Sequence, residues 1–137
     1  MDKLEALDIL ISGIDSEWQK LLVNPKLKEI IKILVQEEKI ITPKLPQVFE
    51  FARLTSLKEV SVVIIGQDPY PTKDHAHGLA FSCKKGVPAS LLNIYNCLVK
   101  HKIIKSSPMH GDLTSWASQG VLMINRALTT HEGRSNV

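Results

Sequence analysis

The sequence predicts an α/β protein with parallel strands, and three observations support this fold class. Two short runs are almost entirely apolar, VSVVII at 60–65 and VLMIN at 121–125. The first is β-branched at nearly every position, which suits a strand covered on both faces of a parallel sheet. Helix-forming sequence separates the two runs, as a parallel crossover requires. No repeat or linker divides the chain, so we expect a single domain over residues 1–137.

Helices are predicted from capping residues and apolar spacing. Asp15 and Ser16 precede a short helix that carries Trp18, and Asn24–Pro25 is the N-cap and first residue of the next helix. Apolar residues recur in that second helix at helical spacing. We expect three further helices: 47–54, 90–100 with Ser90 as its N-cap, and 113–119 with Asp112 as its cap and Gly120 at its end.

Composition is that of an ordinary globular domain, with 44% apolar and 23% charged residues. The apolar runs are too short to span a bilayer, and the acidic N-terminus is unlike a secretory signal. Cys83 and Cys97 lack metal-ligand spacing, so we expect reduced thiols in an intracellular protein of the cytoplasm or nucleus. A net charge of +3 permits a polyanionic partner without indicating one.

Polar residues follow both predicted strands. The segment GQDPYP, residues 66–71, closes the first strand, and Asn125 ends the second. Open α/β sheets bind ligands beyond the carboxyl ends of their strands, so we expect Asp68 and Asn125 to face one crevice. The pattern alone leaves an alternative open for each, a turn residue before proline and a strand-end turn.

Four ordered blocks carry a more specific signal: VVIIGQDPYP (62–71), AHGLAFS (76–82), PASLLNIY (88–95) and HGDLTSWASQGVLMINRALT (110–129). In order and spacing they resemble the family-1 uracil-DNA glycosylases, and the resemblance covers roughly residues 15–136. It implies a three-layer αβα fold with a central parallel sheet. It also implies an enzyme that flips uracil out of DNA and hydrolyses its N-glycosidic bond to start base excision repair.

The resemblance also implies roles for individual residues. Asp68 would stabilise positive charge on the sugar and orient the attacking water, and Asn125 would read the Watson–Crick edge of the flipped base. Phe81 resembles the aromatic residue on which uracil stacks, and Tyr70 resembles the ring that excludes the methyl group of thymine. Gln67 is expected to line the same pocket.

Outside the pocket, Ser90 resembles a serine that contacts a DNA phosphate, and a plain helix N-cap remains open beside that role. His77 matches the histidine of the family's AHG motif, which we expect to be structural. The resemblance implies no metal, nucleotide or redox cofactor. The implied partner is uracil-containing DNA, single- or double-stranded. The resemblance implies no membrane as a partner.

The chain also departs from the family pattern. Pro71 replaces the usual histidine after GQDPY, which we expect to weaken DNA binding more than bond cleavage. The sequence ends at GRSNV, where the family continues through two more strands, an HPSP-type loop and a leucine wedge loop. We therefore expect a family member that lacks the C-terminal strands and has little activity on duplex DNA. Complete members are monomers, but here strand 60–65 would expose an apolar edge through which chains can associate.

Two other functions remain open at this point. One is a non-catalytic DNA- or partner-binding remnant of the replication accessory type, although such a protein would not need the whole set of pocket residues. The other is an unrelated α/β hydrolase that uses Asp68 as base or nucleophile. A lone aspartate without a nearby helper is a poor general base, which argues against this second alternative.

Overall fold

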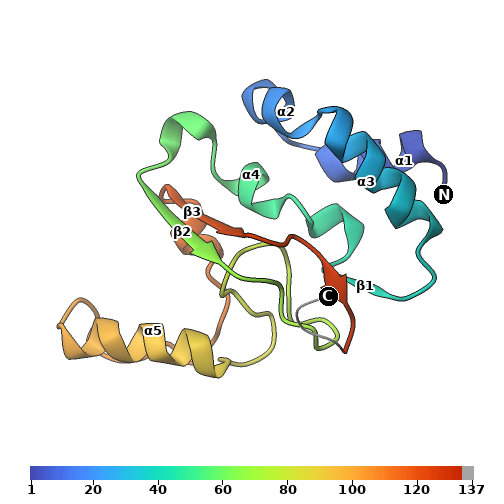
Figure 1. Ribbon diagram of the computed structural model, residues 1–137. Helices are drawn as coiled ribbons and strands as arrows, with labels where there is room; N and C mark the ends of the chain where they lie inside the picture. The colour runs from blue at the N-terminus through green and yellow to red at the C-terminus, as the bar shows by residue number, and fades with distance from the viewer. Residues whose placement is uncertain (134–137) are drawn as a thin grey trace.

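The computed structural model describes residues 1–133, in which helices surround two small sheets (Figure 1). The helices are α1 (Lys3–Ile11), α2 (Ser16–Leu22), α3 (Pro25–Gln36), α4 (Glu50–Leu54), α5 (Ala89–Lys100) and α6 (Thr114–Ala117), with short 3-10 turns η1 (Leu45–Gln47) and η2 (Leu57–Glu59). The strands are β1 (Ile41–Thr42), β2 (Val62–Gly66), β3 (Val121–Asn125) and β4 (Thr130–His131).

The larger sheet pairs β2 and β3 in parallel, in a register that runs from Val62 opposite Val121 to Gly66 opposite Asn125. This confirms the prediction of two parallel strands. The predicted bounds of the second strand match β3 at both ends. The smaller sheet pairs β1 and β4 antiparallel, which brings the segment after β3 back to the segment after α3.

Helices lie on both sides of the β2–β3 pair. In Figure 1, α4 lies on one side of the strands and α5 on the other, while α1, α2 and α3 lie beyond α4. Phe51 of α4, Tyr95 of α5 and Met123 of β3 are each about 1% exposed and belong to one hydrophobic core. The core therefore forms around β3, and the carboxyl ends of the two strands lie at its margin.

The predicted caps of the N-terminal helices are confirmed. The Asp15 carboxylate accepts a hydrogen bond of 2.9 Å from the backbone N–H of Trp18, and α2 begins at the next residue. Asn24 Oδ1 accepts from the N–H of Leu27 at 3.0 Å. Each cap satisfies a backbone donor that has no partner inside the helix. These contacts span only three residues, so the local sequence decides them.

Three helix predictions need correction. Residues 47–54 form a helix only from Glu50, because η1 and an irregular Phe49 precede it. Helix α5 begins at Ala89 with Pro88 as its cap residue, so Ser90 is not the N-cap, and its side chain turns to Tyr70 instead. Helix α6 covers only Thr114–Ala117 and has Leu113 as its cap residue, so Asp112 is not the N-cap, although it accepts a hydrogen bond of 3.0 Å from the backbone N–H of Thr114.

The expectation that the first strand is covered on both faces is wrong. Val62 and Val63 are about half exposed, and Ile65 is 69% exposed. Within residues 1–133, β2 pairs on one side only, with β3, so its other edge has no neighbouring strand. The expected apolar edge is therefore present. Within the same residues, no helix is long and apolar enough to cross a bilayer.

This edge leads to a prediction about behaviour in solution. An unpaired apolar strand favours edge-to-edge association, and a lysine on the edge suppresses it. We expect Ile65→Lys to lower self-association in sedimentation velocity while it changes the free energy of unfolding by less than about 0.5 kcal/mol. Ile40→Lys is the matched control, because Ile40 is 67% exposed but lies outside β2. Equal association in both variants would contradict the prediction.

Candidate active site

Backbone pairing continues past the ends of β2 and β3 and fixes the segments that follow. The N–H of Arg126 donates to the carbonyl of Gly66 at 2.9 Å, and the N–H of Ala127 donates to the carbonyl of Gln67 at 3.0 Å. Asp68 is the next residue after this pairing. The strand ends thus hold the Asp68 and Asn125 backbones close together, as the sequence predicted.

All six predicted site residues line one open hollow of about 330 Å³: Gln67, Asp68, Tyr70, Phe81, Ser90 and Asn125. This volume is at the lower end of the range of small-ligand sites, and it suits a ligand the size of one base. Gln67 lines only this outer hollow. Its backbone carbonyl accepts a hydrogen bond from the N–H of Ala127, and the residue is exposed.

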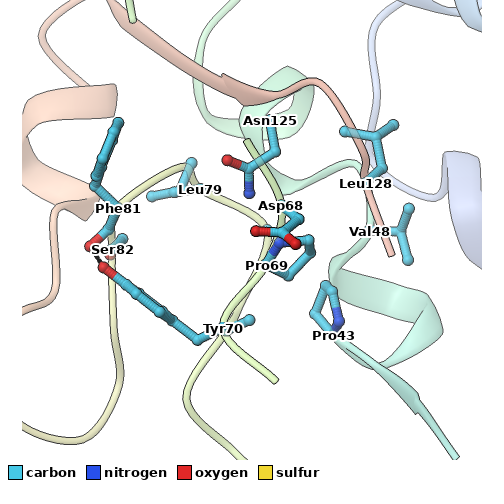
Figure 2. A pocket seen from close by; sticks show the side chains of 12 residues that line it. Pro43, Val48, Asp68, Pro69, Tyr70, Leu79, Phe81, Ser82, Asn125 and Leu128 are labelled. Atoms are coloured by element: carbon cyan, nitrogen blue, oxygen red, sulfur yellow. Dashed lines mark hydrogen bonds between the residues drawn. The ribbon is translucent and has the colours of Figure 1, made fainter. Parts of the chain in front are cut away.

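A deeper pocket continues inward from the hollow. Asp68, Tyr70, Phe81 and Asn125 line it as well, together with apolar side chains such as Leu128 (Figure 2). Only about 10 Å³ is free there, roughly the space of one water molecule. A ring therefore fits the outer hollow, and its deeper insertion requires the lining side chains to move.

Asn125 is the most unusual polar group at this site. Its Oδ1 atom is buried and has no hydrogen-bond partner among the described residues. Figure 2 shows its amide beside the Asp68 carboxyl group, on the same side of the pocket. A buried acceptor without a partner costs about 1–3 kcal/mol, so a ligand that reached this oxygen and donated a hydrogen bond would recover that cost.

Gly66 makes the position of Asn125 possible, although the sequence reasoning assigned it no role. The two residues lie opposite each other in the β2–β3 register. A Cβ atom at Gly66 would overlap Asn125 Oδ1 and would lie 3.0 Å from the Cβ of Ala80. The absence of a side chain therefore lets the asparagine fold over the end of β2. The available signal was a glycine directly at the end of a strand.

Phe81 has a left-handed backbone, with φ of 67°. Such a conformation is rare for a bulky residue, and it persists only where the surroundings hold it. On one side, the N–H of Ala80 donates to the carbonyl of Met123 at 3.2 Å. On the other, the Phe81 carbonyl accepts from the Tyr70 hydroxyl at 2.7 Å. In Figure 2 the Phe81 ring points away from Tyr70, so the two rings do not face each other.

Tyr70 reaches across the hollow to α5. Its hydroxyl lies 3.3 Å from Ser90 Oγ, and Ser90 is the second residue of that helix. Burial raises the pKa of Tyr70, more than the hydrogen bond from Ser90 lowers it, so the hydroxyl keeps its proton at neutral pH. The hydroxyl thereby links the loop after β2 to the start of α5.

His77 and Ser82 form a buried network behind the pocket. His77 Nε2 lies 2.6 Å from Ser82 Oγ, which accepts a hydrogen bond of 2.8 Å from the N–H of Leu113. Burial lowers the pKa of His77, although Asp112, 3.8 Å away, favours the protonated ring. The buried network agrees with the expected structural role of His77. It also anchors Ser82, which lines the inner pocket next to Phe81 and was missed in the sequence.

Pro71 lies at the rim of the hollow, where its carbonyl accepts a hydrogen bond of 2.7 Å from the N–H of Gly133. This bond ties the loop after β2 to the segment after β4. Among residues 1–133, no group of three or more histidine, cysteine, aspartate or glutamate side chains is placed to hold a metal ion. The hollow itself presents one carboxylate, two amides, a serine hydroxyl and two aromatic rings.

Fold and hollow together define the class: an α/β protein whose polar side chains meet beyond the carboxyl ends of parallel strands, where such folds bind ligands. No protein-family model matches the chain. Curated relatives and solved structures do match it, and they agree with one another.

Two bacterial proteins named uracil-DNA glycosylase are clear relatives. The protein of Shewanella oneidensis is 45% identical over 118 residues, which cover 82% of this chain and 54% of the relative. The protein of Deinococcus radiodurans is 43% identical over 136 residues, which cover 93% of this chain and 55% of the relative. The chain thus spans about half the length of the curated relatives it matches.

Solved structures give the same result. The crystal structure of mimivirus uracil-DNA glycosylase matches with a TM-score of 0.78 and 31% identity, over 100% of this chain and 50% of that chain. A variant of the mimivirus enzyme in complex with UGI matches with a TM-score of 0.83 and 30% identity, over 100% of this chain and 54% of that chain. The chain belongs to the uracil-DNA glycosylase family, and it has that family's fold.

The contact between Gly66 and Asn125 leads to a prediction. In Gly66→Ala, the new methyl group would occupy the place of the amide oxygen, so we expect the side-chain amide signals of Asn125 to move in NMR spectra. Overpacking of this kind should lower the free energy of unfolding by about 1–3 kcal/mol. The double variant Gly66→Ala with Asn125→Ala should recover most of that loss. If the double variant does not recover the free energy of unfolding, the new methyl group collides with a group other than the Asn125 side chain.

The buried His77 ring leads to a prediction about pH. Because burial lowers its pKa, the unfolded chain takes up a proton at a higher pH than the folded chain. Its contribution to stability is complete above about pH 6.5 and declines as the pH falls from there towards the lowered pKa. Asp112 and Glu50 reduce this effect by attracting the proton, and Lys84 adds to it.

Urea unfolding at several pH values between 5 and 8 measures this effect. We expect His77→Gln to flatten the pH dependence of the unfolding free energy, whatever its effect on absolute stability. His101→Gln, a change to an exposed ring just after α5, should retain the dependence. If the His77 variant keeps the same slope as the unchanged chain, the decline has another origin.

Proposed function

We propose that this chain binds uracil-containing DNA and hydrolyses the N-glycosidic bond of the uracil nucleotide, the reaction that starts base excision repair. One observation carries the proposal: Asp68 and Asn125 line the same base-sized hollow, and the buried Oδ1 of Asn125 has no hydrogen-bond partner among the described residues. Relatives of the same family that bear the name uracil-DNA glycosylase support it.

Asn125 is the proposed reader of the base. Uracil offers an N3–H donor next to an O4 acceptor, and an asparagine amide can accept from the first and donate to the second. Cytosine offers an acceptor and a donor at these positions, which would leave the buried Oδ1 without a hydrogen. The asparagine rejects cytosine only if its amide keeps the orientation in which Oδ1 occupies the space that Gly66 leaves free.

Asp68 is the proposed catalytic residue. As the bond between the base N1 and the sugar C1′ breaks, positive charge grows on the sugar, and a nearby carboxylate stabilises it. The same carboxylate orients a water molecule, whose oxygen bonds to C1′ while uracil leaves with the electron pair of the broken bond. One hydrogen of the water stays on the new C1′ hydroxyl group and the other reaches the departing uracil anion through solvent, so the products are free uracil and an abasic site.

The remaining hollow residues select and position the base. The Phe81 ring supplies the stacking surface, and the Tyr70 ring narrows the space beside uracil C5, where thymine carries a methyl group. Gln67 lines the opening. Ser90, exposed near the start of α5, is the proposed donor to a phosphate of the strand, where backbone N–H groups of the first helical turn add to the attraction.

A single-stranded oligonucleotide with one uracil tests the proposal, because no base pair has to be broken before the base enters the hollow. We expect strand scission after alkali treatment, and none with the same oligonucleotide carrying thymine. Binding that depends on salt but not on uracil, with no abasic product, would identify a non-catalytic DNA-binding protein instead.

The role of Asp68 has its own prediction. Asp68→Asn should lower the rate of uracil release about 10²–10³-fold, while affinity for the oligonucleotide stays within a few fold. Asp74→Asn is the control, since Asp74 lies on the same loop but outside the hollow, where it faces Lys44 and Lys85 at 3.9 and 3.7 Å. Similar losses of the rate of uracil release in both variants would mean that the Asp68 carboxylate supports the structure of the loop and takes no part in the reaction.

A further inference from the structure

Two hydroxyl groups and a carbonyl form a chain along one side of the hollow. Tyr70 Oη lies 2.7 Å from the Phe81 carbonyl and 3.3 Å from Ser90 Oγ. A carbonyl can only accept, so the single hydrogen of the Tyr70 hydroxyl points to Phe81. It follows that Ser90 is the donor to Tyr70. The chain has one direction, from Ser90 through Tyr70 to Phe81.

This direction limits what Ser90 can do. Its hydroxyl also has a single hydrogen, which goes either to Tyr70 or to another acceptor such as a phosphate oxygen. Ser90 is exposed, and its 3.3 Å contact is long for a bond between hydroxyl groups, so the hydrogen is easily diverted. An anion bound at Ser90 therefore withdraws the donor from Tyr70.

The other end of the chain is sensitive to such a change. Phe81 has its left-handed backbone at φ of 67°, and the bond from Tyr70 fixes the orientation of its carbonyl. Hydrogen bonds in a chain polarise one another, so loss of the donor from Ser90 weakens the bond that Tyr70 gives to Phe81. Burial raises the pKa of Tyr70, which keeps the hydroxyl a donor throughout.

We propose that the Tyr70 hydroxyl is a positioning group that couples anion binding at Ser90 to the backbone of Phe81, separately from the role of the Tyr70 ring. The proposal rests on the proposed function in one respect, that the anion is a phosphate of the DNA strand. In this view, a phosphate captured by Ser90 loosens the strained Phe81, so the stacking ring can adjust as the base arrives. Contact with the strand thereby prepares the base site.

NMR spectroscopy tests the coupling without any need for catalysis. Ser90→Ala should shift the backbone amide signals of Phe81 and Ser82 when Tyr70 is present, and should leave them in place in the Tyr70→Phe background. Tyr95→Phe is the matched control, because the Tyr95 hydroxyl also donates to a backbone carbonyl, that of His110 at 2.9 Å. In the Tyr95→Phe background the shifts should persist. Shifts that also persist in the Tyr70→Phe background would overturn the proposal.

Kinetics on the uracil oligonucleotide give a second test. Tyr70→Phe should slow uracil release about two- to tenfold, the effect of one hydrogen bond, and should still reject thymine because the ring remains. The combined loss in Tyr70→Phe with Ser90→Ala should be about twofold or more smaller than the product of the single losses. Ser90→Ala with Tyr95→Phe should show no such difference.

The outcomes separate the two proposals. In one outcome, the unchanged chain releases uracil while the loss of rate in the double variant equals the product of the losses in Tyr70→Phe and Ser90→Ala. In that case the proposed coupling is wrong and the proposed function stands. If the unchanged chain neither binds nor cleaves the oligonucleotide, the proposed function fails, and the NMR shifts alone decide the coupling. Loss of thymine rejection in Tyr70→Phe would also overturn the proposal, since it would show that hydroxyl and ring cannot be separated.

Discussion

The site depends on one constraint, the parallel register that sets Gly66 opposite Asn125 at the ends of β2 and β3. A slip of one residue would turn the side chain of Asn125 to the other face of the sheet and away from Asp68. The two hydrogen bonds that continue beyond the strands fix this register further, because they tie the GQDPYP loop to the chain that leaves β3. The carboxylate and the amide come together because of backbone pairing, before any side chain contributes.

A second layer of contacts holds what the strands bring together. Gly66 leaves room for the amide, Tyr70 holds the carbonyl of Phe81, and Ser82 joins the same loop to Leu113. At the hollow, these contacts leave Asn125 Oδ1 buried without a partner; among the described residues, His131 Nδ1 in β4 shares this property. Strained backbone and an unsatisfied acceptor are both costs for the folded chain, and both occur at the proposed base site.

The sheet itself is less protected than the site. Parallel strands are ordinarily covered on both faces, yet β2 exposes Val63 and Ile65 along an edge with no neighbouring strand in residues 1–133. Ile65 lies on this edge and also lines the hollow, beside Gly66 and Asn125 where the two strands end. The chain spans about half the length of the relatives it matches. The exposed edge and the hollow therefore share a residue, and a change at the edge also reaches the proposed base site.

The sequence by itself determined the features that short-range physics controls. The caps at Asp15 and Asn24, the strand at 121–125 and the convergence of Asp68 with Asn125 follow from local donors, apolar runs and the direction of parallel strands. The matched blocks added the family and the set of pocket residues. Only the tertiary structure decided the rest: that Ser90 bonds Tyr70 rather than capping a helix, that Gly66 makes room for Asn125, and that Val62 and Val63, on opposite faces of β2, are both about half exposed. Each of these depends on atoms from segments far apart in the chain, and no local pattern records how closely such segments approach.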